Sequence, residues 1–239
     1  MTAIEKPLLQ EAAASSSAMA LDEIRQLVEK DLPQISQNSF DGQKPTLAQI
    51  RDWIWFQGAP KKQGLRHPRI ALFSNHSPHA QSLQEEIRAH AHPLIALTEE
   101  ANADLQIYEL QGRLTTDEDT ARAMSYGMMA AQPGIDLLVV ATLDDTKEDL
   151  TDLTHLTPSN RSDIAALCGT IIAARLAKIP VLLTGNGATT AAGLLKKLNA
   201  GALAHCRNPH DILDIAANTA PPMDAVLLIP FLKSIARLG

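Results

Sequence analysis

From Arg69 onward, short apolar runs alternate with longer segments of helical periodicity, and this pattern limits the possible folds more than any other feature of the chain. The runs at 70–73, 105–110, 136–141 and 181–184 have the length and composition of buried strands. Helical spacing or a helix-start signal follows each of them. The alternation predicts an α/β fold with a doubly wound, mostly parallel sheet and right-handed crossovers.

The composition agrees with this fold class. Apolar residues make up 45% of the 239 residues, but aromatic residues only 3%. The core must therefore consist mainly of Ala, Leu, Ile and Val, which is typical of helices packed on a parallel sheet. The length predicts one large domain, alone or with a small appendage.

Several residues signal where the helices begin. Thr115 with Glu118 predicts a capping box, and Ser162 or Asp163 is expected to cap the long apolar helix that follows. Upstream, two amphipathic helices are predicted near 21–28 and 46–56. We expect these two to form an arm or lid rather than a layer of the core.

Charge and cysteine content exclude several classes of partner. The formal net charge is −6, and the basic residues are scattered, so nucleic acid is not an expected partner. Cys168 and Cys206 lack metal-site or disulfide spacing and are expected to be reduced thiols. We identify no signal-peptide core and no apolar stretch of about 18 to 20 residues, so no membrane contact and a cytoplasmic location are expected.

Ligands of open α/β sheets bind beyond the carboxyl ends of the strands. Asn75 and His76 follow the first strand directly, where they could hydrogen-bond a ring or, for His76, act as a general base. The alternative is a polar strand end that only caps the next helix. We call the edge of the sheet at the carboxyl ends of its strands the rim. The loops expected there are 74–79, 142–146, 184–189 and the stretch after Leu110.

Two further rim loops carry candidate ligand-binding residues. Thr142, Asp144 and Asp145 could bind a ribose or a metal, although acids at a helix start also favour the helix dipole. A second set could surround a phosphate at the start of a helix predicted from Thr189 to Leu198. This set consists of Gly185, Asn186, Gly187 and Thr189. It departs from the dinucleotide fingerprint because Thr190 replaces the third glycine.

A third group contains His205, Cys206 and His210. The residue types suggest zinc, but a fourth ligand and standard spacing are lacking. We therefore expect the two histidines to be solvated or hydrogen-bonded. No metal or other cofactor is predicted.

Several segments, in order, resemble the nicotinate-nucleotide:dimethylbenzimidazole phosphoribosyltransferase family. The most similar stretch runs from Asp163 to Gly185, with Asp-Ile-Ala-Ala-Leu followed by Pro-Val-Leu-Leu-Thr-Gly. The ending 227–232 resembles the family's last helix, which favours helix over strand there despite Pro230. The resemblance implies a Rossmann-like sheet with a small helical appendage formed by both termini, and a homodimer. The expected division is 1–60 and 61–239, with the last helix, 224–238, packing on the small domain.

The resemblance also implies a reaction, namely transfer of phosphoribose from nicotinate mononucleotide to dimethylbenzimidazole, giving α-ribazole 5′-phosphate for the lower ligand of cobalamin. Family members use a glutamate as general base just before the last helix, where this chain has Pro221. The glycine-rich loop after the third strand is replaced by 141–146, whose carboxylates would repel an anionic nucleotide unless a cation lay beside them. The glycine pair before the long apolar helix is Asn160-Arg161.

Two hypotheses follow. The chain is a divergent phosphoribosyltransferase in which Asp224 or His76 serves as the base, acting on a nucleotide and a benzimidazole-like base. Alternatively, it is a non-catalytic relative that binds a small ligand or a partner subunit at the same rim.

Overall fold

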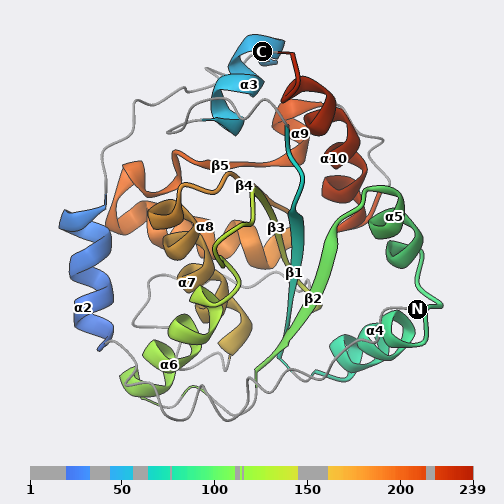
Figure 1. Cartoon of the computed structure of the whole chain (residues 1–239). Coiled ribbons are helices and arrows are strands. Elements are labelled where there is room, and N and C mark those ends of the chain that lie inside the picture. Colours follow the sequence, from blue (N-terminus) through green and yellow to red (C-terminus); the bar gives the residue numbers. More distant parts are fainter. Residues whose placement is uncertain are drawn as a thin grey trace.

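A computed structural model describes residues 20–32, 44–55, 64–75, 77–110, 114, 116–144, 161–213 and 219–238 of the chain. Within these residues, five strands form one parallel sheet in the order β2-β1-β3-β4-β5 (Figure 1). The prediction of an α/β fold with a mostly parallel sheet is confirmed. The strands are β1 (Pro68–Ser74), β2 (Asp104–Glu109), β3 (Leu137–Thr142), β4 (Val181–Leu183) and β5 (Cys206–Arg207).

Four of these strands lie within two residues of their predicted bounds, because apolar runs at the centre of a sheet are easily recognised. β5 was not predicted. It has only two residues and lies in what the sequence suggested to be a polar connection, yet Cys206 pairs with Val181 of β4.

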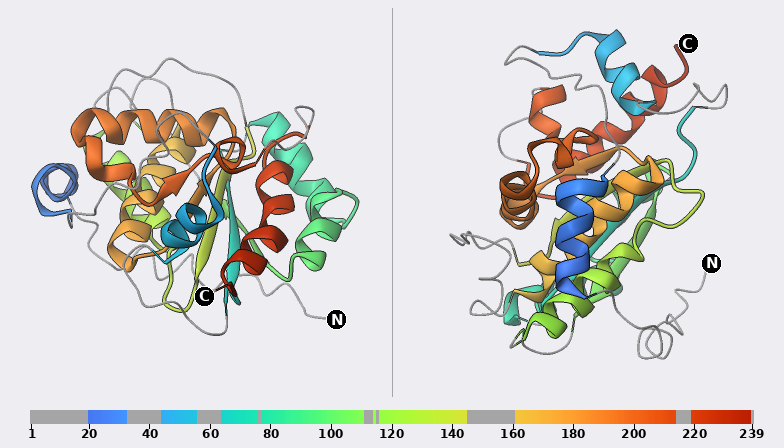
Figure 2. Two further views of the ribbon diagram at one scale, coloured as in Figure 1. Left: turned by 90° about the horizontal axis from the view of Figure 1, so that it is seen from above. Right: turned by 90° about the vertical axis from the view of Figure 1, so that its left-hand side faces the viewer.

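Helices cover both faces of the sheet, and the view from above shows the three layers (Figure 2). One face carries α6, α7 and α8, with α2 outside them. Their bounds are α2 (Leu21–Gln26, continued by the π-helical turn Leu27–Asp31), α6 (Asp117–Met128), α7 (Ser162–Ala177) and α8 (Gly185–Leu198, followed by the 3-10 turn Ala200–Leu203).

The opposite face is covered by helices from distant parts of the sequence. They are α3 (Leu47–Ile54), α4 (Pro78–Arg88), α5 (Leu94–Glu100), α9 (Pro209–Ile212) and α10 (Met223–Ile235). Strand side chains alternate between the two layers: Ala71 and Phe73 of β1 face the α6–α8 layer, and Ile70 and Leu72 face the other. The sheet therefore has apolar contacts on both faces, as a parallel sheet requires.

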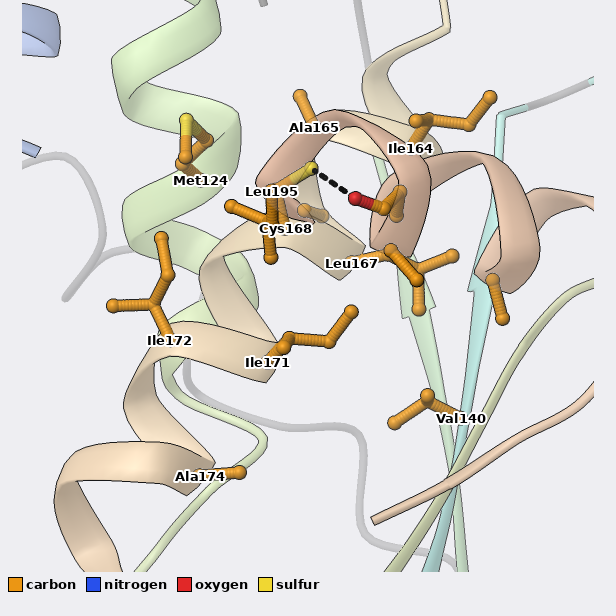
Figure 3. Packing of buried hydrophobic residues seen from close by; sticks show 14 of the residues in the cluster. Met124, Val140, Ile164, Ala165, Leu167, Cys168, Ile171, Ile172, Ala174 and Leu195 are labelled. Atoms are coloured by element: carbon orange, nitrogen blue, oxygen red, sulfur yellow. Dashed lines mark hydrogen bonds between the residues drawn. The ribbon is translucent and has the colours of Figure 1, made fainter. Parts of the chain in front are cut away.

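The contact between α6 and α7 is unusually close. A Cβ atom on Gly127 of α6 would lie 1.9 Å from the carbonyl oxygen of Ala166, and one on Gly169 of α7 would lie 1.9 Å from that of Met124. The side chain of Cys168, beside Gly169, is turned toward α8, where its thiol lies 3.8 Å from the Ala191 carbonyl oxygen (Figure 3). These glycines let α7 lie between α6 and α8 with its entire first three turns buried.

Three helix starts differ from their predictions. Thr116 with Asp119 forms the capping box of α6, one residue after the predicted pair, since it is the Thr116 hydroxyl that accepts from the Asp119 amide. The position before α7 is occupied by Arg161, without a side-chain cap. α8 begins at Gly185 rather than at Thr189, because the glycine turn is itself helical. The helix predicted at the end of the chain is confirmed as α10, with Pro230 inside it.

The amino-terminal helices contact the sheet layers at specific points. The indole nitrogen of Trp53 in α3 donates to the His205 carbonyl at 2.9 Å, and Asn199 donates to the Val28 carbonyl at 2.8 Å. The domain division at residue 60 stays a prediction. Among the described residues no helix combines the length and apolar character needed to cross a membrane.

Candidate functional site

The strand order places a topological switch between β1 and β3. From β1 the chain crosses to β2 on one side, and the next strand, β3, lies on the other side of β1. Helices leaving the two strands therefore diverge and leave a crevice beyond their carboxyl ends, the usual ligand site of such sheets. Asn75 follows β1, Thr142 is the last residue of β3 and Asp144 lies two residues after it, so these predicted residues lie at the switch point.

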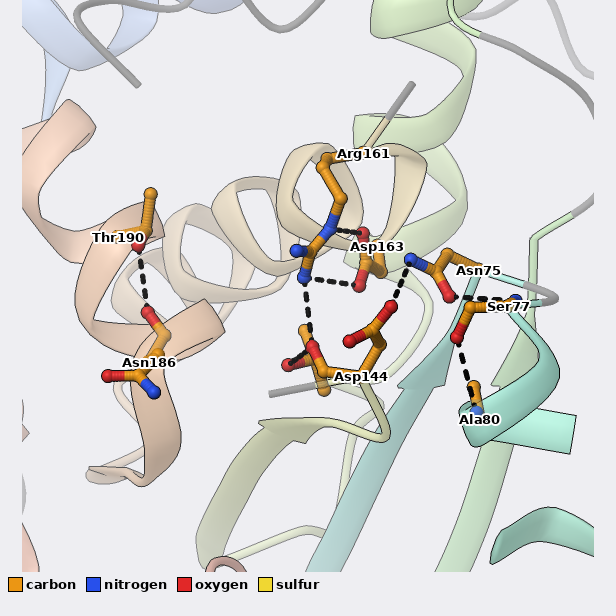
Figure 4. A network of polar contacts seen from close by, with 9 residues as sticks. Asn75, Ser77, Ala80, Asp144, Arg161, Asp163, Asn186 and Thr190 are labelled. Atoms are coloured by element: carbon orange, nitrogen blue, oxygen red, sulfur yellow. Dashed lines mark hydrogen bonds and ion pairs between the residues drawn. The ribbon is translucent and has the colours of Figure 1, made fainter. Parts of the chain in front are cut away.

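The residues at the switch point form a continuous polar network (Figure 4). The Asn75 amide donates to the Asp144 carboxylate at 3.4 Å. The Asp144 carbonyl accepts from the Thr142 hydroxyl at 2.9 Å and from the Arg161 guanidinium at 3.0 Å. The network thus joins the ends of two strands to the start of α7.

Arg161 and Asp163 are a buried ion pair within this network. Two guanidinium nitrogens of Arg161 each lie 2.9 Å from a different Asp163 carboxylate oxygen, and the side chains are 3% and 0% exposed. Burial raises the pKa of the Asp163 carboxyl, and Arg161 opposes that shift by hydrogen bonding and by its charge. A bidentate pair of this kind fixes the direction of the guanidinium.

The place of Arg161 in this network was not predicted from the sequence, where it was noted only as a replacement for a glycine. A signal was nevertheless present. α7 is so apolar that every residue of its first turn must be buried, and a buried Asp163 requires a nearby cation. The contact of Arg161 with the loop after β3 is to the backbone carbonyl of Asp144, and its charge is paired with Asp163.

The glycine turn after β4 packs against the end of β3. Gly185 has a φ of +84°, which favours glycine. A Cβ atom on Gly187 would lie 2.4 Å from the Thr142 hydroxyl oxygen, so this position needs glycine for close approach. Two predicted ligand-binding residues, Thr142 and Gly187, are thus in direct contact.

Asn186 and Thr189 lie on the exposed first turns of α8. The Thr189 hydroxyl donates to the Gly185 carbonyl at 2.9 Å, as Thr190 does to Asn186 at 2.8 Å. Both hydroxyls therefore satisfy helix carbonyls in this structure. The dipole of α8 makes the start of this helix favourable for an anion.

Asp224, a predicted candidate base, lies in the first turn of α10 and is only 3% exposed. One carboxylate oxygen accepts from the Thr184 hydroxyl at 2.6 Å and from the Ala225 amide at 2.7 Å. Thr184 directly follows β4, so α10 is joined to the same edge of the sheet. Pro221 is exposed in the turn before α10, and the predicted residues His76 and Asp145 lie outside the described residues.

The histidines near β5 separate into two environments. His205 is fully buried, and burial lowers the pKa of its imidazole to about 3. The Cys206 thiol lies 3.5 Å from the His205 ring. His210 is instead half-exposed, with its Nε2 atom 3.5 Å from an Asp224 carboxylate oxygen. Within the part of the chain that the structure describes, no three His, Cys, Asp or Glu residues form a possible metal site.

The geometry brings hydrogen-bond donors and acceptors from β1, β3, β4, α7 and α8 to one edge of the sheet. The amino end of α8 supplies positive potential, while the charge of Arg161 is paired with Asp163 and the Asp224 carboxylate is buried against Thr184. Such a rim can orient a small polar ring and hold one anionic group.

Comparisons with known proteins identify relatives of part of the chain. Residues 139–239 match a family model described as phosphoribosyltransferase. The nicotinate-nucleotide–dimethylbenzimidazole phosphoribosyltransferase of Agrobacterium fabrum is 44% identical over 73 residues, which are 30% of this chain and 21% of that protein. The protein of the same name from Allorhizobium ampelinum is 54% identical over 48 residues, 20% of this chain and 14% of that protein. The matched stretches thus span about a fifth or less of these relatives.

Solved structures share the fold over a longer stretch. A crystal structure of CobT from Thermus thermophilus has a TM-score of 0.63 at 13% identity and covers 91% of this chain and 95% of that one. A nicotinate-nucleotide–dimethylbenzimidazole phosphoribosyltransferase from the same organism has a TM-score of 0.58 at 13% identity, covering 90% and 94%. At this identity the likeness establishes the fold. The sequence matches show that part of the chain, within residues 139–239, is similar to the nicotinate-nucleotide:dimethylbenzimidazole phosphoribosyltransferase family.

Proposed function

We propose that the chain binds a nucleotide and a benzimidazole-like base at the rim beyond β1, β3 and β4, and transfers phosphoribose between nitrogen bases as a divergent member of this family. The observation that carries the proposal is the extent of the family match. Residues 139–239 include the ends of β3, β4 and β5 and the starts of α7, α8 and α10, which together supply most of the rim.

The charges at the rim are consistent with an anionic ligand held at a defined place. Asp163 is compensated by Arg161, and the Asp144 carboxylate is turned toward Asn75. The amino end of α8, which begins at Gly185, is the positive end of the helix dipole and favours an anionic group such as a phosphate. We therefore expect the phosphate at α8 and the base toward the switch point.

A second candidate function is a non-catalytic relative that binds the same kind of ligand or a partner subunit. Pro221, which cannot accept a proton, favours it, since it occupies the position of the family glutamate. Asp224 does not substitute directly, because its carboxylate is buried and accepts from Thr184 and Ala225. The two candidates differ in turnover and not in binding.

Two measurements test the proposal. The protein is incubated with nicotinate mononucleotide and dimethylbenzimidazole while nicotinate release is followed, and the Tm is measured with each compound alone. We expect release above the buffer rate and an increase in Tm. A Tm increase without release would support the non-catalytic candidate. If neither release nor a Tm increase is seen, both candidates are overturned as binders of these compounds.

A matched pair of glycine variants locates the binding site on α8. Gly187→Ala places a methyl group against Thr142 and is expected to abolish the ligand-dependent Tm increase. Gly193→Ala, on the same helix with open space around its Cβ position, should retain it. Unchanged binding in both variants would place the ligand away from the start of α8.

A further inference from the structure

Three side chains from separate elements form a chain of contacts at the rim. Thr184 follows β4, Asp224 lies at the start of α10, and His210 lies three residues after β5. The Thr184 hydroxyl is 2.6 Å from one Asp224 carboxylate oxygen, and His210 Nε2 is 3.5 Å from the other. All three therefore lie beyond the carboxyl ends of parallel strands.

The exposure of these groups differs sharply. The Asp224 side chain is 4% exposed, whereas that of His210 is 47% exposed. Asp224 is thus shielded from a molecule at the rim, while the imidazole can meet one. The 3.5 Å separation is long for a hydrogen bond, but such contacts commonly shorten when substrate binds.

The backbone of His210 is held by two hydrogen bonds. Its amide donates to the Asn208 side chain at 2.9 Å, and its carbonyl accepts from Lys44 Nζ at 3.0 Å. Because Nε2 faces a carboxylate, that nitrogen carries the proton in the neutral ring, and the lone pair is on Nδ1. A carboxylate behind a histidine fixes tautomer and orientation in this manner in many general bases.

We propose that His210 is the proton acceptor of the transfer reaction, and that Asp224, itself fixed by Thr184, is its positioning residue. This inference rests on the proposed phosphoribosyl transfer. It assigns the base to a residue outside the turn that contains Pro221.

The transfer exchanges one C–N bond for another and moves one proton, and the electron pair of the broken N–H bond stays with the benzimidazole ring and keeps it neutral. One ring nitrogen of the benzimidazole forms a bond to C1′ of the ribose with its lone pair. The bond from C1′ to the nicotinate nitrogen breaks, and its electron pair leaves with nicotinate. The proton on the other benzimidazole nitrogen passes to Nδ1 of His210, which later releases it to water.

The test compares His210→Ala with the unmodified protein in the nicotinate-release assay. We expect kcat to fall by about 10²- to 10⁴-fold, as on loss of a positioned general base, with little change in KM for either substrate. Added imidazole should restore part of kcat in His210→Ala. Asp224→Asn should lower kcat and should not respond to imidazole, because His210 is still present.

His90→Asn is the matched control. His90 is also an exposed histidine, but it follows the carboxyl end of α4 and has a φ of 56°, which asparagine tolerates. Its kcat should equal that of the unmodified protein. Thermal unfolding of each variant distinguishes loss of the base from loss of the fold.

The outcomes separate the two proposals. If the unmodified protein turns over and a folded His210→Ala variant keeps its kcat within threefold, the role of His210 is overturned and the proposed function stays intact. A loss of kcat that imidazole cannot restore would also contradict the role as proton acceptor. Absence of turnover in the unmodified protein would overturn the proposed transfer, and the role of His210 with it.

Discussion

At the scale of single residues, the charged and polar groups of this chain depend on burial that the sequence does not display. Asn75, Thr142 and Asp144 were predicted at a common rim because the position of a residue after a strand fixes which edge of the sheet it occupies. Arg161 was overlooked because its role depends on two partners, Asp163 and the Asp144 carbonyl, that only the folded chain brings together. Position along a strand can be predicted, but partnership between side chains cannot.

His205 allows a prediction of pH dependence. Burial lowers the pKa of this imidazole from 6.5 to about 3. Between these values the unfolded chain binds a proton that the native protein does not, so stability is lost as pH falls through this window. Near pH 5 the free energy of unfolding should fall by about 1.4 kcal/mol for each unit by which the pH is lowered, from this group alone.

The measurement is urea unfolding at several pH values between 7 and 5, for the unmodified protein and His205→Gln. The variant is expected to have lower stability at pH 7, having lost its fit beside Ile171. The slope of its free energy of unfolding against pH near pH 5 should, however, be smaller, by the amount that corresponds to about one proton taken up on unfolding. Equal slopes would mean that His205 is protonated in the native protein.

At the scale of secondary-structure elements, periodicity predicted which segments are helices better than how closely they pack. The apolar helix 162–177 was expected, but its contact with α6 through Gly127 and Gly169 was not. The sequence does not show whether a glycine within a helix lies against a neighbouring helix, as Gly169 does, or faces open space, as Gly193 does. The start of α8 shows the same limit, because the turn at Gly185 was expected to precede the helix and instead begins it.

Two glycine-to-alanine variants should have opposite effects for this reason. Gly169→Ala places a Cβ atom 1.9 Å from the Met124 carbonyl oxygen, so α6 and α7 must separate. We expect a loss of about 1 to 3 kcal/mol despite the better helix propensity of alanine. Gly193→Ala meets nothing within 4 Å and should stabilise the protein by about 0.5 to 1 kcal/mol. Chemical denaturation of both variants checks the signs, and a stabilising Gly169→Ala would contradict the close contact.

At the scale of the whole molecule, the part that matches the family model is not an independent structural unit. Residues 139–239 contain four of the six residues of β3 together with β4 and β5, but β1 lies beside β3 and comes from outside the match. α7 likewise packs on α6, which is also outside it. The Asp136 carboxylate accepts from the amides of Arg66 and His67, which ties the entry of β3 to that of β1.

A split chain tests this interdependence. The turn at Gly134 is exposed, with a φ of +97°, and a Cβ atom placed there would meet nothing within 4 Å, so the chain can be divided there into 1–134 and 135–239. Alone, 135–239 would expose the edge of β3 and the face of α7 that α6 covers. We expect it to show no cooperative thermal transition. Mixing the two fragments should restore one, at a Tm below that of the intact chain because association costs entropy. A cooperative transition in 135–239 alone would show that the matched region folds without β1 and α6. The contacts of β1 with β3 and of α6 with α7 would then not be required for its stability.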